Sequence, residues 1–242
     1  MVSHCPWKKF LKVNNKENSM TLEIKTINLK FLGGLASVNC YLVKTDTTFI
    51  LIDTGPSNKR IDIEKRLESA GCKPGSLKLV LITHGDSDHT GNAAYLCDKY
   101  GTKIAMHRDD SGMVEQGDMS FNRKPNIIVK ILFSLLFFGL NKSDRFKPDI
   151  FVEDGQDLSN YGFHAKVIHI PGHSKGSIGI LTADGDLFCG DLITNTNKPS
   201  LNSIMDDKVA ANASFKKLQS LELKTVYPGH GEPFSLQLSS LL

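Results

Sequence analysis

Four ligand-type side chains follow directly after an apolar run, in the stretch THGDSDHTGN at residues 83–92. The preceding LKLVLIT has the composition of an interior strand that is covered on both faces. The following GNAAYLCDKYG has a helical pattern. His84, Asp86, Asp88 and His89 are therefore predicted to lie in a loop between a strand and a helix, with rigid elements on both sides.

Three later segments repeat this arrangement, each with one histidine or aspartate in a glycine-containing loop at or near the end of an apolar strand. They are HIPGHSKGS with His173, LFCGDLI with Asp191 and VYPGHGEP with His230. A metal site needs side chains from distant parts of the chain to converge, and glycine lets loop backbones approach without steric clash. We therefore expect these residues to meet at one edge of a sheet.

Elsewhere the chain alternates between strand and helix patterns. Short apolar pieces between residues 21 and 55 predict successive strands joined by turns. Residues 58–70 predict an amphipathic helix with Ile61, Ile63 and Leu67 on one side and a glycine at its end. Further strands are expected within residues 149–192, and a last helix is expected at about residues 207–221, before the strand KTVYP.

With these segments in this order, the chain resembles the metallo-β-lactamase superfamily of metal-dependent hydrolases. The hallmark of that family is an HxHxDH loop followed by single His, Asp and His ligands. The resemblance extends from about Leu22 to Pro233 and includes the early IDTG turn at Asp53. It implies an α/β fold, a four-layer αββα sandwich in which two mixed β-sheets are flanked by helices and the metals lie at one edge.

The resemblance also implies a dinuclear site for two divalent metal ions, with zinc as the family's usual metal. The first metal would take His84, position 86 and His173. The second would take Asp88, His89 and His230, and Asp191 would bridge the two. The implied mechanism is attack of a metal-bridging hydroxide on a carbonyl or phosphoryl centre, with Asp88 as the catalytic residue that orients or deprotonates the water.

Asp86 departs from the family pattern, which has histidine at this position. A carboxylate can replace imidazole as a ligand, and it shifts metal preference from zinc toward iron or manganese. It also makes the first metal a weaker Lewis acid. The family's flavodiiron members carry a glutamate there. The alternative is that Asp86 accepts a hydrogen bond and orients a ligand histidine.

The GHSKGS and YPGHGEP loops resemble those of short-chain lactonases, glyoxalase II and β-lactamase-like enzymes. The resemblance therefore implies cleavage of an ester, thioester or lactone-type bond in a small-molecule substrate. Three alternatives stay open: a small phosphodiester as substrate, an iron-dependent oxidoreductase suggested by Asp86, and a binding module without metal.

Charge and cysteine content narrow the remaining possibilities. The 29 basic and 26 acidic residues are interspersed along most of the chain, so no nucleic-acid partner is implied. The five cysteines lack CxxC spacing, which is typical of unpaired thiols in a reducing cytosol and predicts a cytoplasmic protein. Residues 1–19 lack the pattern of a secretory signal and are interpreted as an extension to a single domain at 20–242.

An apolar segment, NIIVKILFSLLFFGL, lies inside a predicted insertion at about residues 111–148. It is shorter than the about 20 residues of an ordinary membrane span, so no integral membrane segment is expected. Three interpretations of residues 127–140 compete: a buried or lid-like helix, a weak membrane or lipid contact, and a homodimer contact.

Other polar residues receive structural interpretations. Asp53 is expected to organise the loop under the site by hydrogen bonding. His107, His164 and His169 match no ligand position and are expected to be surface or hydrogen-bonded histidines. Ser174 is not expected to be a nucleophile, because no base is spaced to activate it.

Overall fold

The computed structural model describes residues 22–46, 48–123 and 139–235. Its longer strands and its helices follow the predicted order of elements, except for a helix at Arg108–Gln116 that the sequence did not predict. The strands are β1 (Glu23–Phe31), β2 (Ala36–Lys44), β3 (Phe49–Ile52), β4 (Leu77–Leu81), β5 (Lys103–Met106), β6 (Ile150–Phe151), β7 (Ala165–His169), β8 (Ile178–Thr182), β9 (Asp186–Gly190), β10 (Ile193–Thr194), β11 (Ser200–Leu201), β12 (Thr225–Pro228) and β13 (Phe234–Ser235). The α-helices are α2 (Arg60–Ser69), α3 (Ser87–Thr90), α4 (Ala93–Tyr100), α5 (Arg108–Gln116) and α7 (Lys208–Gln219).

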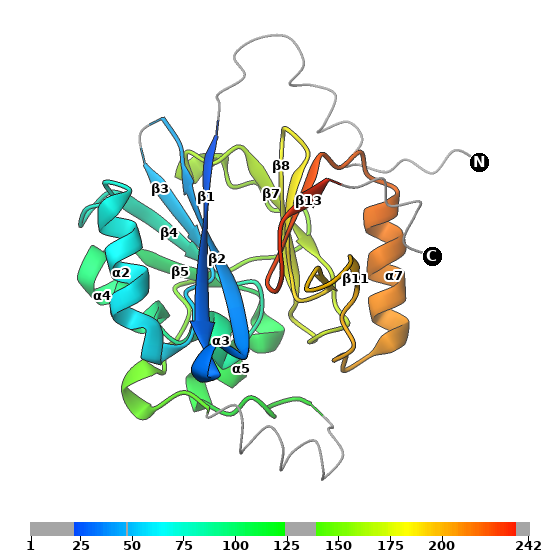
Figure 1. The fold of residues 1–242 in the computed structure, drawn as a ribbon, viewed down its shortest axis with the longest axis horizontal. Coiled ribbons are helices and arrows are strands. Elements are labelled where there is room, and N and C mark those ends of the chain that lie inside the picture. Colours follow the sequence, from blue (N-terminus) through cyan, green and yellow to red (C-terminus); the bar gives the residue numbers. More distant parts are fainter. Residues whose placement is uncertain (1–21, 47, 124–138, 236–242) are drawn as a thin grey trace.

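The strands form two mixed sheets. The first has the order β1-β2-β3-β4-β5-β6, antiparallel from β1 to β3 and parallel from β3 to β6. The second has the order β13-β12-β9-β8-β7, with one parallel pair between β12 and β9. The two sheets face each other in the middle of the molecule (Figure 1).

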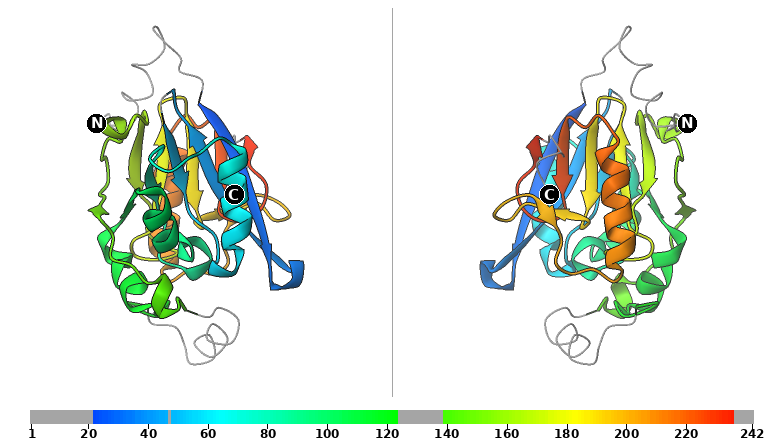
Figure 2. Two further views of the ribbon diagram at one scale, coloured as in Figure 1. Left: turned by 90° about the vertical axis from the view of Figure 1, so that its left-hand side faces the viewer. Right: turned by 90° about the vertical axis from the view of Figure 1, so that its right-hand side faces the viewer.

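Three apolar cores separate four layers. One core lies between the first sheet and its helices, one between the two sheets, and one between the second sheet and α7. Helices α2 and α4 face the viewer on one side of the molecule and α7 on the other (Figure 2). The αββα sandwich expected from the sequence is confirmed.

Strand β4 shows why the interior strands have continuous apolar sequences. Val80 packs into the core beneath the helices, whereas Leu79 and Leu81 pack into the core between the sheets. Successive side chains of a strand point to opposite faces, so the part of β4 that is covered on both sides is apolar, whereas Lys78 near its beginning is exposed.

Helix α2 corrects one detail of the predicted amphipathic helix. Ile63 and Leu67 are fully buried, but Ile61 is 65% exposed. Two positions along a helix correspond to a rotation of about 200°, so Ile61 and Ile63 lie on opposite sides. Helix α7 agrees with its predicted position and is capped by Asp207, whose carboxylate accepts hydrogen bonds from two backbone N–H groups of the first turn.

Two predictions lie wholly or largely outside the described residues. They concern the extension at residues 1–19 and the apolar segment at 127–140, of which only Gly139 and Leu140 are described. Leu140 is buried in the core beneath the helices of the first sheet. Within residues 22–46, 48–123 and 139–235, no helix combines the length and apolar character needed to cross a bilayer.

Candidate metal centre

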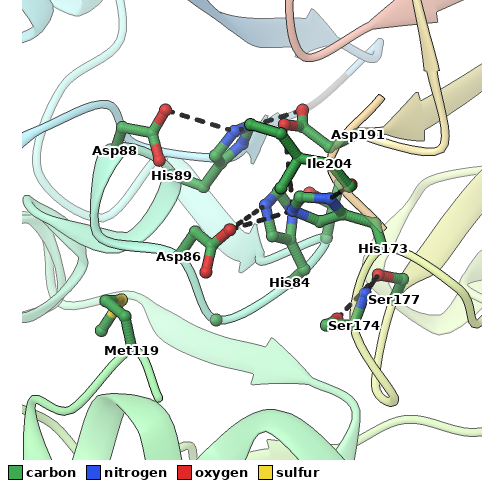
Figure 3. A network of polar contacts seen from close by, with 12 residues as sticks. His84, Asp86, Asp88, His89, Met119, His173, Ser174, Ser177, Asp191 and Ile204 are labelled. Carbon is green, nitrogen blue, oxygen red and sulfur yellow. Dashed lines mark hydrogen bonds and ion pairs between the residues drawn. The ribbon is translucent and has the colours of Figure 1, made fainter. Parts of the chain in front are cut away.

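The predicted ligand residues all follow the carboxyl ends of strands. The loop after β4 and the short helix α3 supply four of them, and the loops after β7, β9 and β12 supply one each. Figure 3 shows the labelled members of this group turned toward one another. The structure brings together His84, Asp86, Asp88, His89, His173, Asp191 and His230.

Three residues form a first group of donor atoms. Asp86 Oδ2 lies 2.9 Å from His173 Nε2 and 3.5 Å from His84 Nε2. All three donor atoms lie within 4.8 Å of one another. These are the residues that the resemblance assigns to the first metal, so one ion could be held between them.

Asp88, His89 and His230 form a second group with the same compactness. Asp88 Oδ2 lies 3.8 Å from His89 Nε2 and 3.5 Å from His230 Nε2. Asp191 lies between the two groups, since its Oδ2 is 3.1 Å from His230 Nε2 and 4.0 Å from His173 Nε2. That position is the one expected of a carboxylate shared by two ions.

Backbone carbonyls fix the tautomers of two imidazoles. His173 Nδ1 lies 2.8 Å from the carbonyl oxygen of Ile204, and His230 Nδ1 lies 2.6 Å from that of Ser37. Since a carbonyl only accepts, both Nδ1 atoms carry the proton and donate. In the neutral imidazole the lone pair is then on Nε2, which faces the other donor atoms.

Asp53 and Thr83 orient the other two imidazoles. His89 Nδ1 lies 2.9 Å from Asp53 Oδ2, which also accepts a 2.7 Å hydrogen bond from the Thr83 hydroxyl. That hydroxyl therefore accepts from His84 Nδ1, which is 3.0 Å away. The predicted role of Asp53 as a residue that organises the loop agrees with these contacts.

The inward atoms are poised for a ligand. Within the described part of the chain, His84 Nε2, His89 Nε2 and Asp191 Oδ1 are buried without a hydrogen-bond partner. Buried polar atoms normally have a hydrogen-bond partner. Three close atoms without one, each able to donate a lone pair, are the arrangement expected around a bound cation. Imidazole nitrogens together with carboxylate oxygens fit a divalent ion such as zinc, iron or manganese.

Comparison with known proteins agrees with the fold and with this centre. A family model described as the metallo-beta-lactamase superfamily matches residues 33–230, which is most of the chain. The chain belongs to the metallo-beta-lactamase superfamily. As a member of this metal-dependent superfamily, it carries candidate His and Asp ligands in the order that its sequence predicted.

Relatives of this superfamily member include enzymes and solved structures. The hydroxyacylglutathione hydrolase GloC of Haemophilus influenzae is 31% identical over 158 residues, covering 64% of this chain and 66% of the relative. The archaeal protein ST1585 of Sulfolobus tokodaii has a TM-score of 0.70 at 23% identity, covering 90% of this chain and 83% of that one. TTHA1623, described in a di-iron-bound form, has a TM-score of 0.66 at 26% identity and covers 88% and 96% of the two chains.

The matches to curated relatives are partial in length. This chain spans 66% of the Haemophilus enzyme, 59% of a Drosophila beta-lactamase-like protein 2 homolog and 65% of Bacillus subtilis YobT.

Electrostatics couple the acids and imidazoles of the centre. Burial alone would lower the pKa of His230, but the Asp191 carboxylate outweighs it and raises that pKa to about 9. The pKa values of His89 and His173 are raised in the same way, against their burial, by the carboxylates around them. Burial opposes ionisation of Asp191, yet the neighbouring imidazoles His230 and His89 hold its pKa well below the usual range.

Sequence reasoning missed Arg123, which lies behind Asp86. Its Nη1 donates a 2.6 Å hydrogen bond to Asp86 Oδ1, and its Nε donates to Asp206 Oδ2 at 2.8 Å. Arg123 and Asp86 are 37 positions apart, and no local spacing connects them. No sequence signal could have paired them.

Sequence reasoning also missed Asp110, a buried carboxylate that joins two ligand loops. It accepts hydrogen bonds from the backbone N–H groups of Gly85 and Gly176 and from the hydroxyl of Ser174. One signal was available, because Asp110 follows the end of the strand KIAMH just as the ligand residues follow theirs. The hydroxyl of Ser174 is thus engaged by Asp110, outside the predicted ligand set.

A cavity of about 280 Å³ opens onto the donor atoms. Asp86, Asp88, His173, Asp191 and His230 line its floor. The walls combine apolar and uncharged polar side chains. They are Phe31, Ala36, Met119, Ile204, Ser87, Thr194, Thr196, Asn202 and Ser203.

His107, His164 and His169 lie outside this cavity lining. His107 and His169 stack with their ring centroids 4.3 Å apart, and with Asp109 they form another group of close donor atoms. His169 Nε2 lies 2.8 Å from the carbonyl oxygen of Lys175, and His107 Nδ1 accepts from the backbone N–H of Asp109. These hydrogen bonds agree with the structural interpretation of both imidazoles.

Proposed function

We propose that this superfamily member is a metal-dependent hydrolase that cleaves an ester, thioester or lactone bond in a small molecule. The observation that carries the proposal is the common orientation of four imidazoles. Each turns Nε2 toward carboxylate oxygens of the donor groups and holds Nδ1 in a hydrogen bond on its other side. This is the arrangement by which proteins fix histidine as a metal ligand.

The proposed ligand set follows the two compact groups of donor atoms. The first ion would be held by His84, Asp86 and His173, the second by Asp88, His89 and His230, with Asp191 shared. Zinc, iron and manganese all accept such mixed nitrogen and oxygen ligation.

The contacts of Asp86 support direct ligation over an orienting role. An orienting carboxylate binds the outer nitrogen of a ligand histidine, as Asp53 does at His89 Nδ1. Asp86 Oδ2 instead faces the inward Nε2 atoms of His84 and His173. These contacts support its proposed role as a third donor beside them.

Bound divalent cations would supply an acidic water as nucleophile and would stabilise the oxyanion that develops on the substrate. The protein's own contribution is to orient and to move protons. The carboxylate of Asp88 lines the cavity, where it can orient the attacking water and accept its proton. The imidazole of His230 lies 3.5 Å from that carboxylate.

The cavity walls favour an uncharged substrate group. Phe31, Met119 and Ile204 offer apolar surface to an acyl chain, and Thr196 and Asn202 can hydrogen-bond to its polar end. Among the described lining residues none is lysine or arginine, so a phosphodiester would find no cationic side chain there. The relative named as a hydroxyacylglutathione hydrolase supports a thioester within this class.

Iron-dependent redox chemistry is the second candidate. It is favoured by the carboxylate of Asp86 beside the first group of donors, and by the relative described in a di-iron-bound form. This candidate predicts iron in the protein, consumption of oxygen or peroxide, and no hydrolysis.

The test is a substrate panel on protein purified without chelators and loaded with zinc, manganese or ferrous iron in turn. The panel contains nitrophenyl esters of increasing acyl length, an acyl thioester, a lactone, and bis(nitrophenyl) phosphate. We expect carbonyl substrates to be cleaved, and Asp88→Asn to lower kcat by about 100-fold or more. Asp109→Asn removes an exposed carboxylate outside the cavity and should leave kcat unchanged.

The outcomes separate the candidates. Cleavage of the phosphodiester alone would replace the substrate class, and oxygen or peroxide consumption without hydrolysis would replace the reaction. A protein that binds no metal would contradict the proposal as a whole.

A further inference from the structure

Arg123 makes a buried ion pair with Asp86, on the side of the carboxylate that faces away from the histidines. Its Nη1 lies 2.6 Å from Asp86 Oδ1, its Nε lies 2.8 Å from Asp206 Oδ2, and its side chain is only 9% exposed. Nη1 also donates to the backbone carbonyl of Met119 at 3.4 Å. The guanidinium is thus fixed from several directions.

The two carboxylate oxygens of Asp86 have different partners. Oδ1 is engaged by Arg123, whereas Oδ2 faces His173 Nε2 at 2.9 Å and His84 Nε2 at 3.5 Å. Because the guanidinium is planar and its donors are rigid, it fixes the rotation of the carboxylate. Only one oxygen of Asp86 is left to face the first group of donors, as only one nitrogen of a histidine would be.

Charge is the second difference between aspartate and histidine at this position. The positive guanidinium of Arg123 lies 2.6 Å from Asp86 Oδ1, and both side chains are largely shielded from solvent. Arg123 thereby offsets part of the negative charge that a carboxylate adds where a neutral imidazole is the family's usual ligand. Asp206 shares the same guanidinium, so the compensation is partial.

We propose that Arg123 is a positioning residue that enables Asp86 to replace histidine at the first metal site, by orienting its carboxylate and offsetting its charge. The proposal rests on the proposed ligation of metal by Asp86. Arg123 is not among the residues that line the cavity. In this role Arg123 acts only through Asp86. Its effect on metal affinity therefore depends on which residue stands at position 86.

This dependence distinguishes the proposal from a merely structural role. Arg123 also ties its own segment to Asp206, and loss of that tie would disturb the site whatever stands at position 86. A positioning role predicts a reversal instead. With aspartate at 86 the guanidinium should strengthen metal binding, whereas after Asp86→His it would place a positive charge beside a neutral ligand and weaken it.

The experiment compares wild type, Arg123→Met, Asp86→His and the double variant, all as full chains. Zinc content per chain and zinc affinity are measured by elemental analysis and by chelator competition. We expect about two ions per wild-type chain, and weakening of one ion by about 10-fold to 100-fold in Arg123→Met. We expect the double variant to bind that ion more tightly than Asp86→His alone.

Arg60→Met is the matched control, since Arg60 makes a 2.7 Å ion pair with the buried Asp144 outside the donor groups. It should leave zinc content unchanged. Thermal unfolding of each chelator-treated variant checks that the chain folds. Cobalt spectra of the loaded proteins report the ligand set without reference to activity.

Equal weakening by Arg123→Met in both backgrounds, or none in either, would overturn the inference while leaving the proposed metallohydrolase intact. Wild-type protein that binds no zinc, manganese or iron would overturn both.

Discussion

The Asp110 carboxylate accepts a 2.6 Å hydrogen bond from the hydroxyl of Ser174, although 64 positions of sequence separate the two residues. The same carboxylate accepts from the backbone N–H of Gly85, so it joins the loop that carries His84 to the loop that carries His173. The two halves of the first group of donors are thereby held at a fixed separation by a residue that is not itself a donor.

Asp110→Asn should loosen this connection. The amide presents a donor where the carboxylate accepted, so buried hydrogen bonds to a charged acceptor are lost, and we expect the free energy of unfolding to fall by about 1–3 kcal/mol. Zinc affinity of the first site should fall as well. Urea unfolding and chelator competition measure the two effects. Asp109→Asn alters the exposed neighbouring carboxylate, and an equal loss there would contradict the prediction.

Asp53→Asn tests the orientation of His89. Asp53 has a left-handed backbone with φ of 58°, which asparagine tolerates nearly as well, so this variant isolates the lost carboxylate. We expect zinc affinity to fall by about 10-fold to 100-fold, because Asp53 fixes the tautomer of that imidazole. Chelator competition gives the affinity, and an unchanged value would show that His89 is held in place by packing alone.

Gly229→Ala tests the close approach of the β12 loop to the centre. A methyl group at position 229 would overlap the Asp191 carboxylate and would lie 2.7 Å from His89 Cε1. We expect loss of about one zinc ion or more per chain, since both residues belong to the proposed ligand set. Gly101→Ala serves as the comparison, because its methyl group would meet nothing within 4 Å and the change only strains a positive φ.

The pKa of His230, about 9 in the metal-free chain, predicts a pH dependence. A folded-state pKa above the ordinary 6.5 contributes stability that is fully present below pH 6.5 and is lost as pH rises through 9. The raised pKa values of His89 and His173 act in the same direction. The lowered pKa of Asp191 contributes stability that is lost only on acidification, outside this window.

Chelator-treated protein should therefore become less stable between about pH 6.5 and pH 9, by about 3 kcal/mol from His230 alone. Guanidinium unfolding at several pH values measures this slope. Zinc binding at pH 7 should release protons, since the imidazole ligands must be neutral to bind. His230→Ala should flatten the slope, whereas the exposed His164→Ala should leave it unchanged.

Strand ends made the centre predictable from sequence. A residue at or shortly beyond the end of an apolar strand is placed near the sheet edge by the strand itself, so His84, His173 and Asp191 could be located without knowledge of the topology. Resemblance to the family then supplied the sandwich and the grouping of the donors. Ile61 shows the limit of local patterns. It is apolar and was predicted on the buried side of its helix, but it is exposed.

The contacts of Arg123 with Asp86 and of Asp110 with Gly85 show what the sequence could not provide. These pairs are 37 and 25 positions apart, and neither leaves a periodic signal in the sequence. Both positions depend on how separate loops pack together, which is decided by the whole fold. The contacts of Asp86 could therefore not be predicted from the sequence, although the replacement of the family's histidine by aspartate could be seen there.

Neither half of the sandwich contains a complete group of donors. His84 and Asp86 come from the first sheet and need His173 from the second, while Asp88 and His89 need His230. If the two halves were produced as separate polypeptides, neither should retain zinc by itself. Association of the two fragments would then depend on metal. A chelator should separate them, and added zinc should restore the complex.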